Sequence, residues 1–387
     1  MAIPLKYNMR NLIVRRTSTL FTAGSIALTV AVFLTMMALA NGLKAAFIST
    51  GNSSNLIVLR QNSDTETNSS VTPADFQNIK YLDGVAREGN GAPMASAETI
   101  ILINLPRVDN PAGSNIIIRG LSEMGLLLRP QVQIREGRWF RPGSREVVVS
   151  EATARRFVNT QIGERLRFGR SDWNVVGIFT AGGTAFDSEI WCDVNQLMND
   201  YNRTVYSSIL ARTTDVESLD ALTKRIKDDR NLHLDALSEA AYYGKQTSSA
   251  IPVQVLGMFI AVLMAVGAAF AAMNAMYTSV ANRTKEIGTL RVLGFSRFNI
   301  WLSFAIESVA LSLLGGIIGS IVALPINGLT TGTTNFSTFS EIAFQFRVSR
   351  ELIITGLIFS ALIGLVGGSL PALKAAREHI VTALRAH

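Results

Sequence analysis

The chain has few of the residues that most often carry chemistry. Cys192 is its only cysteine, and it has three histidines, His233, His379 and His387. A single cysteine can form neither an intramolecular disulfide nor a thiolate metal cluster. Two histidines lie near the C-terminus and the third lies in a separate polar region, so we do not expect them to converge on a metal or a catalytic serine. We therefore predict no catalytic residue, no cofactor-binding residue and no metal site in this chain.

A nucleotide-binding loop is also missing from the sequence. No G-x-x-x-x-G-K-[ST] motif occurs, in which a glycine-rich backbone and a lysine hold the phosphates of ATP. The glycine pairs at 182–183 and 315–316 lack both the lysine and the strand–turn–helix context of such a loop. We therefore expect that this chain is not an enzyme and does not hydrolyse ATP by itself.

Charge is absent from three long stretches and nearly absent from a fourth. Residues 17–43, 246–282 and 352–373 contain no charged side chain, and residues 298–340 contain only Glu307. About 20 apolar residues are enough to cross the roughly 30 Å hydrocarbon core of a bilayer. The alternative is that the runs are four buried helices of a soluble protein, and the basic residues that flank the runs make this interpretation the weaker one. The sequence therefore predicts an integral membrane α-helical protein with four transmembrane helices, at 17–43, within 246–282, at 298–328 and at 352–373, with a short loop at 329–351.

The first apolar run has one alternative interpretation. Ala38-Leu39-Ala40 has the small-x-small form of a signal-peptidase site, and basic residues precede the run. The hydrophobic part of a signal peptide is usually only about 7–15 residues long, whereas this run has 27 residues. We expect the first helix to be retained; cleavage would leave three helices.

Basic residues lie mainly on one side of the predicted helices. The segments 1–16, 283–297 and 374–387 contain eleven lysines and arginines, and the flanks on the opposite side contain five near the membrane. The positive-inside rule then places both termini and the middle loop in the cytoplasm. We therefore predict a multi-pass protein of the inner membrane with a large periplasmic domain. The net charge of +7 follows from this cytoplasmic excess, and it gives no reason to expect nucleic-acid binding.

The region between the first two helices, 44–245, is long enough for one hydrophobic core or two small ones. Thr72 followed by Pro73 and Asp75 predicts the start of a helix, with Thr72 as its N-cap. β-Branched or apolar segments bounded by Gly, Asn and Ser predict strands. We therefore predict an extracytoplasmic α+β domain of one or two lobes. Its two ends, 43–50 and 240–250, are expected to extend the adjoining membrane helices as stalks. The predicted strands are 55–59, 115–118, 146–149, 173–179 and 206–211, and further helices are 197–201 and 216–228.

The short basic loop 283–297 has an apolar pattern of its own. Apolar residues recur at helical spacing, charged residues lie between them, and a glycine follows as a stop signal. Such a helix either lies flat on the lipid surface or docks on a protein partner. The residues of this candidate coupling helix are Glu286, Ile287, Leu290, Arg291, Leu293 and Gly294.

Two features within the apolar runs indicate contacts between helices. Glu307 would lie about 14 Å from the basic end of its helix, at 1.5 Å per residue. A carboxyl group in the membrane needs a polar partner, so an interhelical hydrogen bond and a proton relay are the two interpretations of this residue. Glycines spaced by four residues allow helices to approach closely. These packing residues are Gly315, Gly319, Gly364 and Gly368.

Several of these segments together resemble the MacB/FtsX-type permeases, the mechanotransmission class (type VII) of ABC transporter subunits. Residues 286–297 resemble the coupling segment of that family, and Glu307, Ser308 and 313–316 resemble the start of its third helix. Residues 137–140, 146–149, 162–163 and 175–178 resemble the MacB-like periplasmic core domain. The C-terminal signature is resembled by Pro371, Ala372, Ala375, Ala376 and Arg377, and then by Ala383, Leu384 and Arg385.

The resemblance implies a permease subunit whose coupling helices dock on a separate ABC ATPase dimer, which would bind ATP and Mg. It also implies a second permease copy, either identical or paralogous, and a periplasmic membrane-fusion adaptor with an outer-membrane channel. The implied function is transmission of an ATP-driven conformational change to the periplasmic domain for efflux of a substrate from the periplasm or outer leaflet. The alternatives are a non-transporting transducer that regulates a cell-wall hydrolase or sensor, and a membrane-anchored receptor or enzyme unrelated to ATP.

Overall fold

The computed structural model describes residues 16–377. The tails 1–15 and 378–387, which include His379, His387 and the Ala383-Leu384-Arg385 part of the C-terminal signature, lie outside the described residues. The described chain divides into two compact units. The helical unit comprises the described residues up to Asn41, the segment Ile251–Leu329, and the described residues from Phe346 onward. The inserted domain comprises Gly42–Ala250 and Thr330–Gln345.

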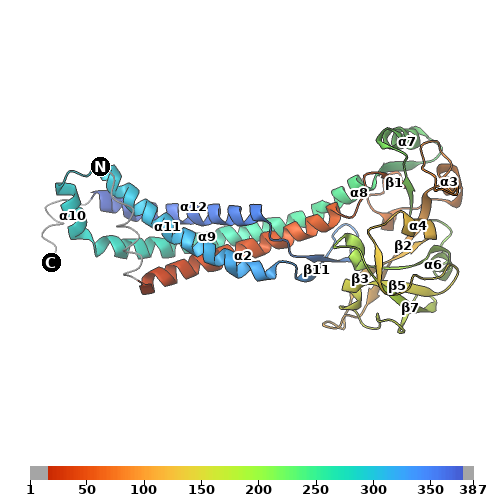
Figure 1. Cartoon of the computed structure of the whole chain (residues 1–387), viewed down its shortest axis with the longest axis horizontal. Helices are drawn as coiled ribbons and strands as arrows, with labels where there is room; N and C mark the ends of the chain where they lie inside the picture. The colour runs from red at the N-terminus through yellow and green to blue at the C-terminus, as the bar shows by residue number, and fades with distance from the viewer. Residues whose placement is uncertain (1–15, 378–387) are drawn as a thin grey trace. The chain divides into compact units, whose positions relative to one another are not determined.

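Four helices of the described chain are long and apolar enough to cross a membrane. Figure 1 shows them running side by side in the helical unit. They are α2 (Arg16–Ile48), α9 (Ile251–Ala281), α11 (Arg297–Ala323) and α12 (Arg350–Arg377), with the short helix α10 (Thr284–Val292) between α9 and α11 and the 3-10 turn η4 (Leu324–Ile326) after α11. This confirms the prediction of four transmembrane helices with a large α+β domain inserted between the first and the second.

The two ends of the inserted domain are helical, as the apolar spacing of the sequence predicts. Helix α2 continues without a break to Ile48. On the return side, α8 (Glu239–Gln246), the 3-10 turn η3 (Thr247–Ala250) and α9 follow one another without an intervening loop residue.

The inserted domain is built on a mixed ten-stranded sheet. The strand order is β10-β1-β9-β2-β3-β8-β5-β7-β4, with β6 paired to β7. Only the pairs β3–β8 and β5–β7 are parallel. The strands are β1 (Asn55–Arg60), β2 (Ala95–Leu105), β3 (Ser114–Leu121), β4 (Gln133–Gly137), β5 (Glu146–Ser150), β6 (Arg165–Phe168), β7 (Ser171–Thr180), β8 (Glu189–Asp193), β9 (Ser208–Arg212) and β10 (Leu234–Ser238).

Short helices connect the strands. The predicted start of α3 is present as a capping box, in which Thr72 and Asp75 bond each other's backbone N–H groups. The helices are α3 (Pro73–Ile79), α4 (Glu123–Leu127), α5 (Glu151–Ala154), α6 (Val194–Asp200) and α7 (Val216–Asp228), with 3-10 turns η1 (Glu66–Asn68) and η2 (Ala185–Ser188).

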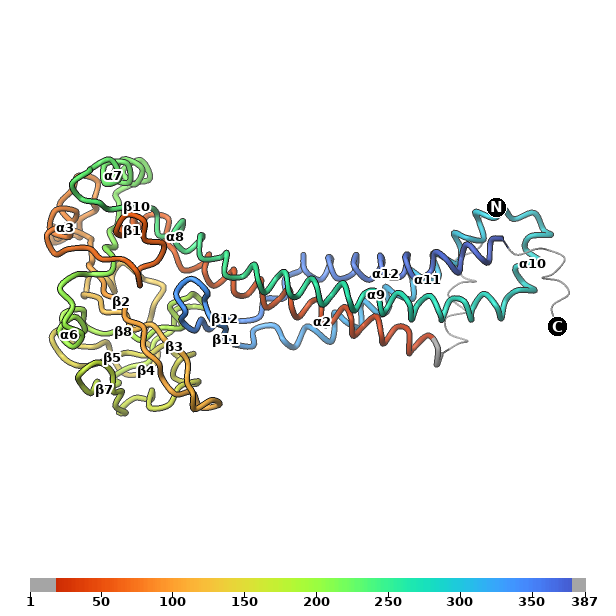
Figure 2. The backbone as a smooth tube through the Cα atoms, turned by 180° about the vertical axis from the view of Figure 1, so that it is seen from behind, coloured from red at the N-terminus to blue at the C-terminus, as the bar shows by residue number. Residues whose placement is uncertain are grey.

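The inserted domain contains two hydrophobic cores, which define two lobes. Lobe 1 packs α3 and α7 on β1, β9 and β10, around side chains such as Val58 and Ile226. Lobe 2 packs α5 and α6 on β3, β5, β7 and β8, around side chains such as Trp173 and Ile190. Strand β2 contributes Ala95 to the first core and Leu105 to the second, so it joins the lobes. Figure 2 shows α3 and α7 beside β1 and β10, and α6 beside β5 and β7.

The segment between α11 and α12 differs from the plain loop that the sequence suggests. Strands β11 (Thr330–Thr334) and β12 (Glu341–Gln345) pair as an antiparallel hairpin. Ile342, Ala343 and Phe344 of β12 are buried, and the hairpin is part of the inserted domain. β11 consists of threonines and a glycine, so it lacks the apolar alternation by which a strand is recognised.

Candidate functional site

Two predicted motifs, the candidate coupling helix and the C-terminal signature, meet at one place in the helical unit. Ile287 of α10 is buried in a small apolar core, which we call the coupling junction. The other buried members of this core come from α9 (Met276, Val280), from α11 (Ile300, Phe304) and from the C-terminal signature on α12 (Ala372, Ala375, Ala376). The junction therefore ties the candidate coupling helix to three membrane helices at once.

A buried ion pair accompanies this core. Nη1 of Arg283, the N-cap residue of α10, lies 2.8 Å from Oε2 of Glu307 on α11, and both side chains are at most 7% exposed. The guanidinium also lies 5.6 Å from the ring centroid of Phe304 and 3.5 Å from a carboxylate oxygen of Glu286. Glu307 is thus the acceptor of an interhelical contact, the first of the two interpretations of this residue.

The other coupling residues divide between the inside and the outside of the unit. Leu290 is half-buried, whereas Leu293 is 68% exposed and its neighbour Val292 is 61% exposed. Gly294 ends the segment with φ +94°, a backbone conformation that glycine adopts without strain. Glu286 is exposed, and Arg291 donates a hydrogen bond to the carbonyl of Phe295 at 3.3 Å. Helical spacing could not tell Ile287, which faces inward, from Leu293, which faces outward.

The four predicted packing glycines lie at contacts between helices. A Cβ atom at Gly315 or Gly319 would meet the α2 backbone at Ala23 or Ala27. On α11, a Cβ atom at Gly364 would meet Ser312 and then the backbone of Ser308, and a Cβ atom at Gly368 would meet the side chain of Ser308. The hydroxyl of Ser308 donates to the carbonyl of Gly364 at 2.8 Å, so small residues and a hydrogen bond hold α11 and α12 together.

The remaining residues of the C-terminal signature take two different positions. Pro371 lies inside α12 and is buried, like the alanines of the junction. Arg377 is the last described residue of α12 and is exposed. A proline within a helix removes one backbone hydrogen bond and tends to bend the helix there.

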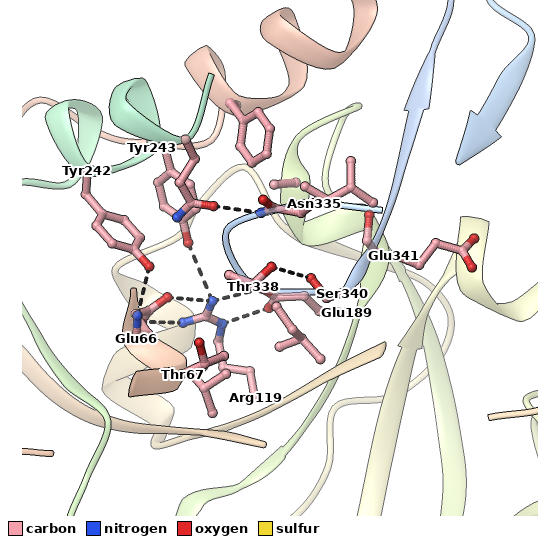
Figure 3. Close-up of a pocket in the computed structure, with 17 residues that line it drawn as sticks. Glu66, Thr67, Arg119, Glu189, Tyr242, Tyr243, Asn335, Thr338, Ser340 and Glu341 are labelled. Carbon is pink, nitrogen blue, oxygen red and sulfur yellow. Dashed lines mark hydrogen bonds and ion pairs between the residues drawn. The ribbon is translucent and has the colours of Figure 1, made fainter. Parts of the chain in front are cut away.

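The inserted domain contains a buried charge cluster that sequence reasoning missed. Two arginines and four glutamates form it, each at most 6% exposed at the side chain. Arg119 pairs with Glu66, Glu98 and Glu189 at 3.0, 2.8 and 2.7 Å. Arg129 also contacts Glu98, and one of its nitrogens lies 3.8 Å from Glu239. Figure 3 shows Arg119 between Glu66 and Glu189. We call these six residues the Arg119–Arg129 cluster.

The carboxylates of the cluster differ in their electrostatics. Burial opposes the ionisation of Glu98, but the charges of Arg129 and Arg119 outweigh it and lower the pKa of this residue. Burial instead raises the pKa of Glu239, the first residue of α8, although Arg129 acts against it. Glu239 accepts hydrogen bonds from Asn52 and Asn55 at 3.0 and 2.8 Å. The cluster thereby connects the start of α8 to both lobes.

A small cavity lies beside the cluster. It has a volume of about 30 Å³ and is lined by residues including Arg119, Tyr243 and Asn335. A buried water needs roughly 10–15 Å³ by this kind of measure, so the cavity has room for about two waters. Pockets that hold drug-sized molecules are about ten times larger or more. This cavity is therefore too small for a drug-sized ligand.

Within residues 16–377, no three His, Cys, Asp or Glu side chains are grouped so as to hold a metal ion. Cys192 is fully buried, and burial raises the pKa of its thiol well above the usual value. This thiol is poorly placed for redox or nucleophilic chemistry.

Comparison with known families assigns both units. The family described as "MacB-like periplasmic core domain" matches residues 19–229, and the family described as "FtsX-like permease C-terminal" matches residues 258–380. The chain belongs to the MacB/FtsX-type permeases of ABC transporters, as the sequence motifs indicate.

Individual relatives are similar to different extents of the chain. The chain is 26% identical over 347 residues to the uncharacterized ABC transporter permease YknZ of Bacillus subtilis, an alignment that covers 84% of this chain and 82% of YknZ. It is 29% identical over 240 residues to the macrolide export ATP-binding/permease protein MacB of Bdellovibrio bacteriovorus, covering 58% of this chain but only 36% of that protein. The solved extracellular domain of YknZ matches 48% of this chain with 16% identity and a TM-score of 0.37.

Proposed function

We propose that this permease transmits ATP-driven conformational changes from a separate ATPase subunit, through its membrane helices, to the inserted domain. The coupling junction is the observation that supports this proposal. It anchors α10 through Ile287 and Arg283, while Val292 and Leu293 on the same segment are left exposed. Packed cores are nearly incompressible, so a push on an anchored helix is passed to its neighbours. ATP and Mg would be bound by the ATPase, in agreement with the missing nucleotide-binding loop.

The charge distribution supports an orientation. With the basic segments 283–297 and 374–387 in the cytoplasm, the exposed residues Val292 and Leu293 face the compartment that contains ATP. The inserted domain then lies in the periplasm. A pair of ATPase subunits would require two copies of α10, so a permease dimer, of identical or paralogous chains, is part of the proposal.

The first version of this function is export of a substrate from the periplasm or outer leaflet. It would involve a periplasmic adaptor and an outer-membrane channel. It draws on MacB, which is named for macrolide export. The second version is a transducer that moves a periplasmic partner and transports nothing. The cavity beside Arg119 is too small to enclose a drug-sized substrate.

The docking step can be tested with the substitution Leu293→Glu. A carboxylate at an exposed apolar position would be buried without a partner in the interface, so we expect co-purification with the ATPase to be lost while the permease still inserts into the membrane. Val216→Glu is a matched control, because Val216 is also exposed (71%) but lies on α7 of the inserted domain. Unchanged ATPase binding by Leu293→Glu would show that α10 rests on lipid.

A further inference from the structure

The two lobes of the inserted domain are connected differently to the membrane helices. Lobe 1 is next to them in the chain, because β1 follows α2 and β10 leads directly into α8 and α9. Lobe 2 is built from a segment inserted into lobe 1, between β2 and β9. No membrane helix therefore leads directly into lobe 2 along the chain.

The β11–β12 hairpin adds a contact between lobe 2 and the chain that joins the other two membrane helices, beside the contacts that α8 makes through the Arg119–Arg129 cluster. It is covalently continuous with α11 and α12, and its carboxylate Glu341 is bound by two arginines of lobe 2. Nη1 of Arg107 lies 3.1 Å from both oxygens of Glu341, and Arg156 contacts the same carboxylate. The Glu341 side chain is only 5% exposed, so water screens this interaction poorly. In addition, the backbone N–H of Ala343 donates to the hydroxyl of Ser188 at 2.6 Å.

The hairpin also contacts the helical ends of the inserted domain. The amide of Asn335 donates to Gln246 of α8 at 3.0 Å and accepts from the hydroxyl of Ser249 at 2.9 Å. A Cβ atom at Gly42 of α2 would collide with the carbonyl of Gln345. The hairpin is thus held between lobe 2 on one side and the ends of α2 and α8 on the other.

We infer that the hairpin is a second mechanical input to the inserted domain, in which Glu341 passes the displacement of α11 and α12 to lobe 2 while α2 and α9 move lobe 1. This inference rests on the proposed transmission function and specifies which residues carry it. A displacement of one helix pair against the other then changes the distance between the lobes.

Glu341 is suited to this role because its removal loosens a specific contact. Burial lowers the pKa of Arg156, and the positive charge of Arg107 lowers it as well. The carboxylate of Glu341 acts in the opposite direction and raises it. Without the shared carboxylate, two arginines of like charge would face each other at the edge of lobe 2, and the hairpin would lose its charged contact with lobe 2.

The test measures the distance between the lobes in the full permease, reconstituted in membranes with its ATPase. Nitroxide labels at Lys224→Cys on α7 and Arg165→Cys on β6 report on lobe 1 and lobe 2, and both positions are exposed. The native Cys192 is buried and does not compete for the label. We expect a shift in the distance distribution between the nucleotide-free and the ATP-trapped state, and at least a fivefold smaller shift in Glu341→Gln.

Glu146→Gln is the matched control. Glu146 also binds an arginine through both carboxylate oxygens, but that partner, Arg138, is in the same lobe. We expect this variant to keep the full distance shift. An undiminished shift in Glu341→Gln, or a wild-type complex that hydrolyses ATP without any shift between the lobes, would overturn the inference.

A disulfide separates transmission from simple folding. Ser188→Cys with Ala343→Cys, introduced into Glu341→Gln, should restore the distance shift when oxidised and lose it again when reduced. Failure of the oxidised protein to recover would mean that Glu341 serves the fold alone. Co-purification with the ATPase is measured for every variant. If no variant, including wild type, binds the ATPase, the proposed function itself fails; retained binding with an unaltered Glu341→Gln shift contradicts only the role of the hairpin.

Discussion

The coupling junction and the Arg119–Arg129 cluster both bury charge, but they do so in different ways. At the junction, the buried pair of Arg283 and Glu307 connects α10 to α11. The cluster joins two arginines to four glutamates from six separate segments of the inserted domain. A pair between two helices orients one helix against the other, whereas a network fixes many elements at once. We therefore expect the junction to control coupling and the cluster to control the stability of the inserted domain.

The largest expected effect is loss of the centre of the cluster. Arg119→Met would leave the buried carboxylates of Glu66 and Glu189 without their main cation, so we expect the inserted domain to be destabilised by about 3–5 kcal/mol. Urea unfolding followed by tryptophan fluorescence measures this change, because Trp191 is buried and donates a hydrogen bond to Glu189.

The control for this prediction is Arg138→Met. Arg138 also forms an ion pair, with Glu146, but its side chain is 43% exposed. Exposed pairs contribute little to stability, so its unfolding midpoint should stay close to that of the wild type. Equal midpoints for Arg119→Met and Arg138→Met would mean that the cluster does not hold the inserted domain together.

At the junction we expect an effect on coupling that exceeds the effect on folding. Glu307→Ala removes the closest carboxylate of Arg283 and should destabilise the helical unit by about 3 kcal/mol. The double variant Arg283→Leu with Glu307→Leu should recover most of this stability, because a buried pair can be replaced by apolar side chains of similar volume. Thermal stability in detergent measures both variants.

A measurement of ATP turnover then distinguishes whether the ion pair orients α10 or only stabilises the helical unit. If the pair orients α10, the double variant should remain stable yet hydrolyse ATP with its partner without driving the inserted domain. Normal coupling in the double variant would show that Glu307 contributes only to the packing of the helices.

A smaller loss of stability is expected when the close packing of the membrane helices is disturbed. Gly319→Ala places a methyl group against the α2 carbonyl of Ala27, so we expect it to destabilise the bundle by about 1–3 kcal/mol through overpacking. Gly24→Ala is the matched control on α2, since nothing lies within 4 Å of a Cβ there. It should be neutral, or gain up to about 1 kcal/mol from helix propensity. A thermal shift assay that ranks the two variants in the reverse order would contradict this packing.

The smallest expected effect is a pH dependence of stability that arises from Glu239, at the edge of the cluster. Burial raises the pKa of Glu239 above 4.5 in the folded protein. The folded state then binds the proton more tightly than the unfolded state, so the stabilisation is present at low pH and is lost as the pH rises from 4.5 through the folded pKa. Glu239→Gln removes this loss, so its stability relative to wild type should increase as the pH rises from 4 to 8. Urea midpoints at four pH values measure the trend, and a constant difference would show that Glu239 does not titrate abnormally.

The membrane helices and the short helix α10 could be predicted from the sequence because their signals are local. Charge-free runs, glycine spacing and the 283–297 motif each occupy a short stretch of chain. The cluster left no such signal, since Glu66 and Glu189 are 53 and 70 residues away from the Arg119 that binds them. An isolated glutamate in a polar region looks like a surface residue until the fold buries it. For the same reason Glu341 gave no hint of its two arginine partners.

The central claim is that a rigid helical connection carries movement from α10 to the inserted domain, and a flexible insertion tests it most directly. A ten-residue Gly-Ser segment between Ala250 and Ile251 keeps α8, η3 and the hairpin contacts of Asn335 intact but separates them from α9. The same segment in the exposed turn after Asn90 is the control. A flexible linker of this kind cannot carry a rigid displacement. We predict that the reconstituted complex with the insertion at Ala250 still hydrolyses ATP but loses the ATP-dependent distance change between Lys224 and Arg165, while the control keeps it. An undiminished distance change with the insertion at Ala250 would contradict the claim.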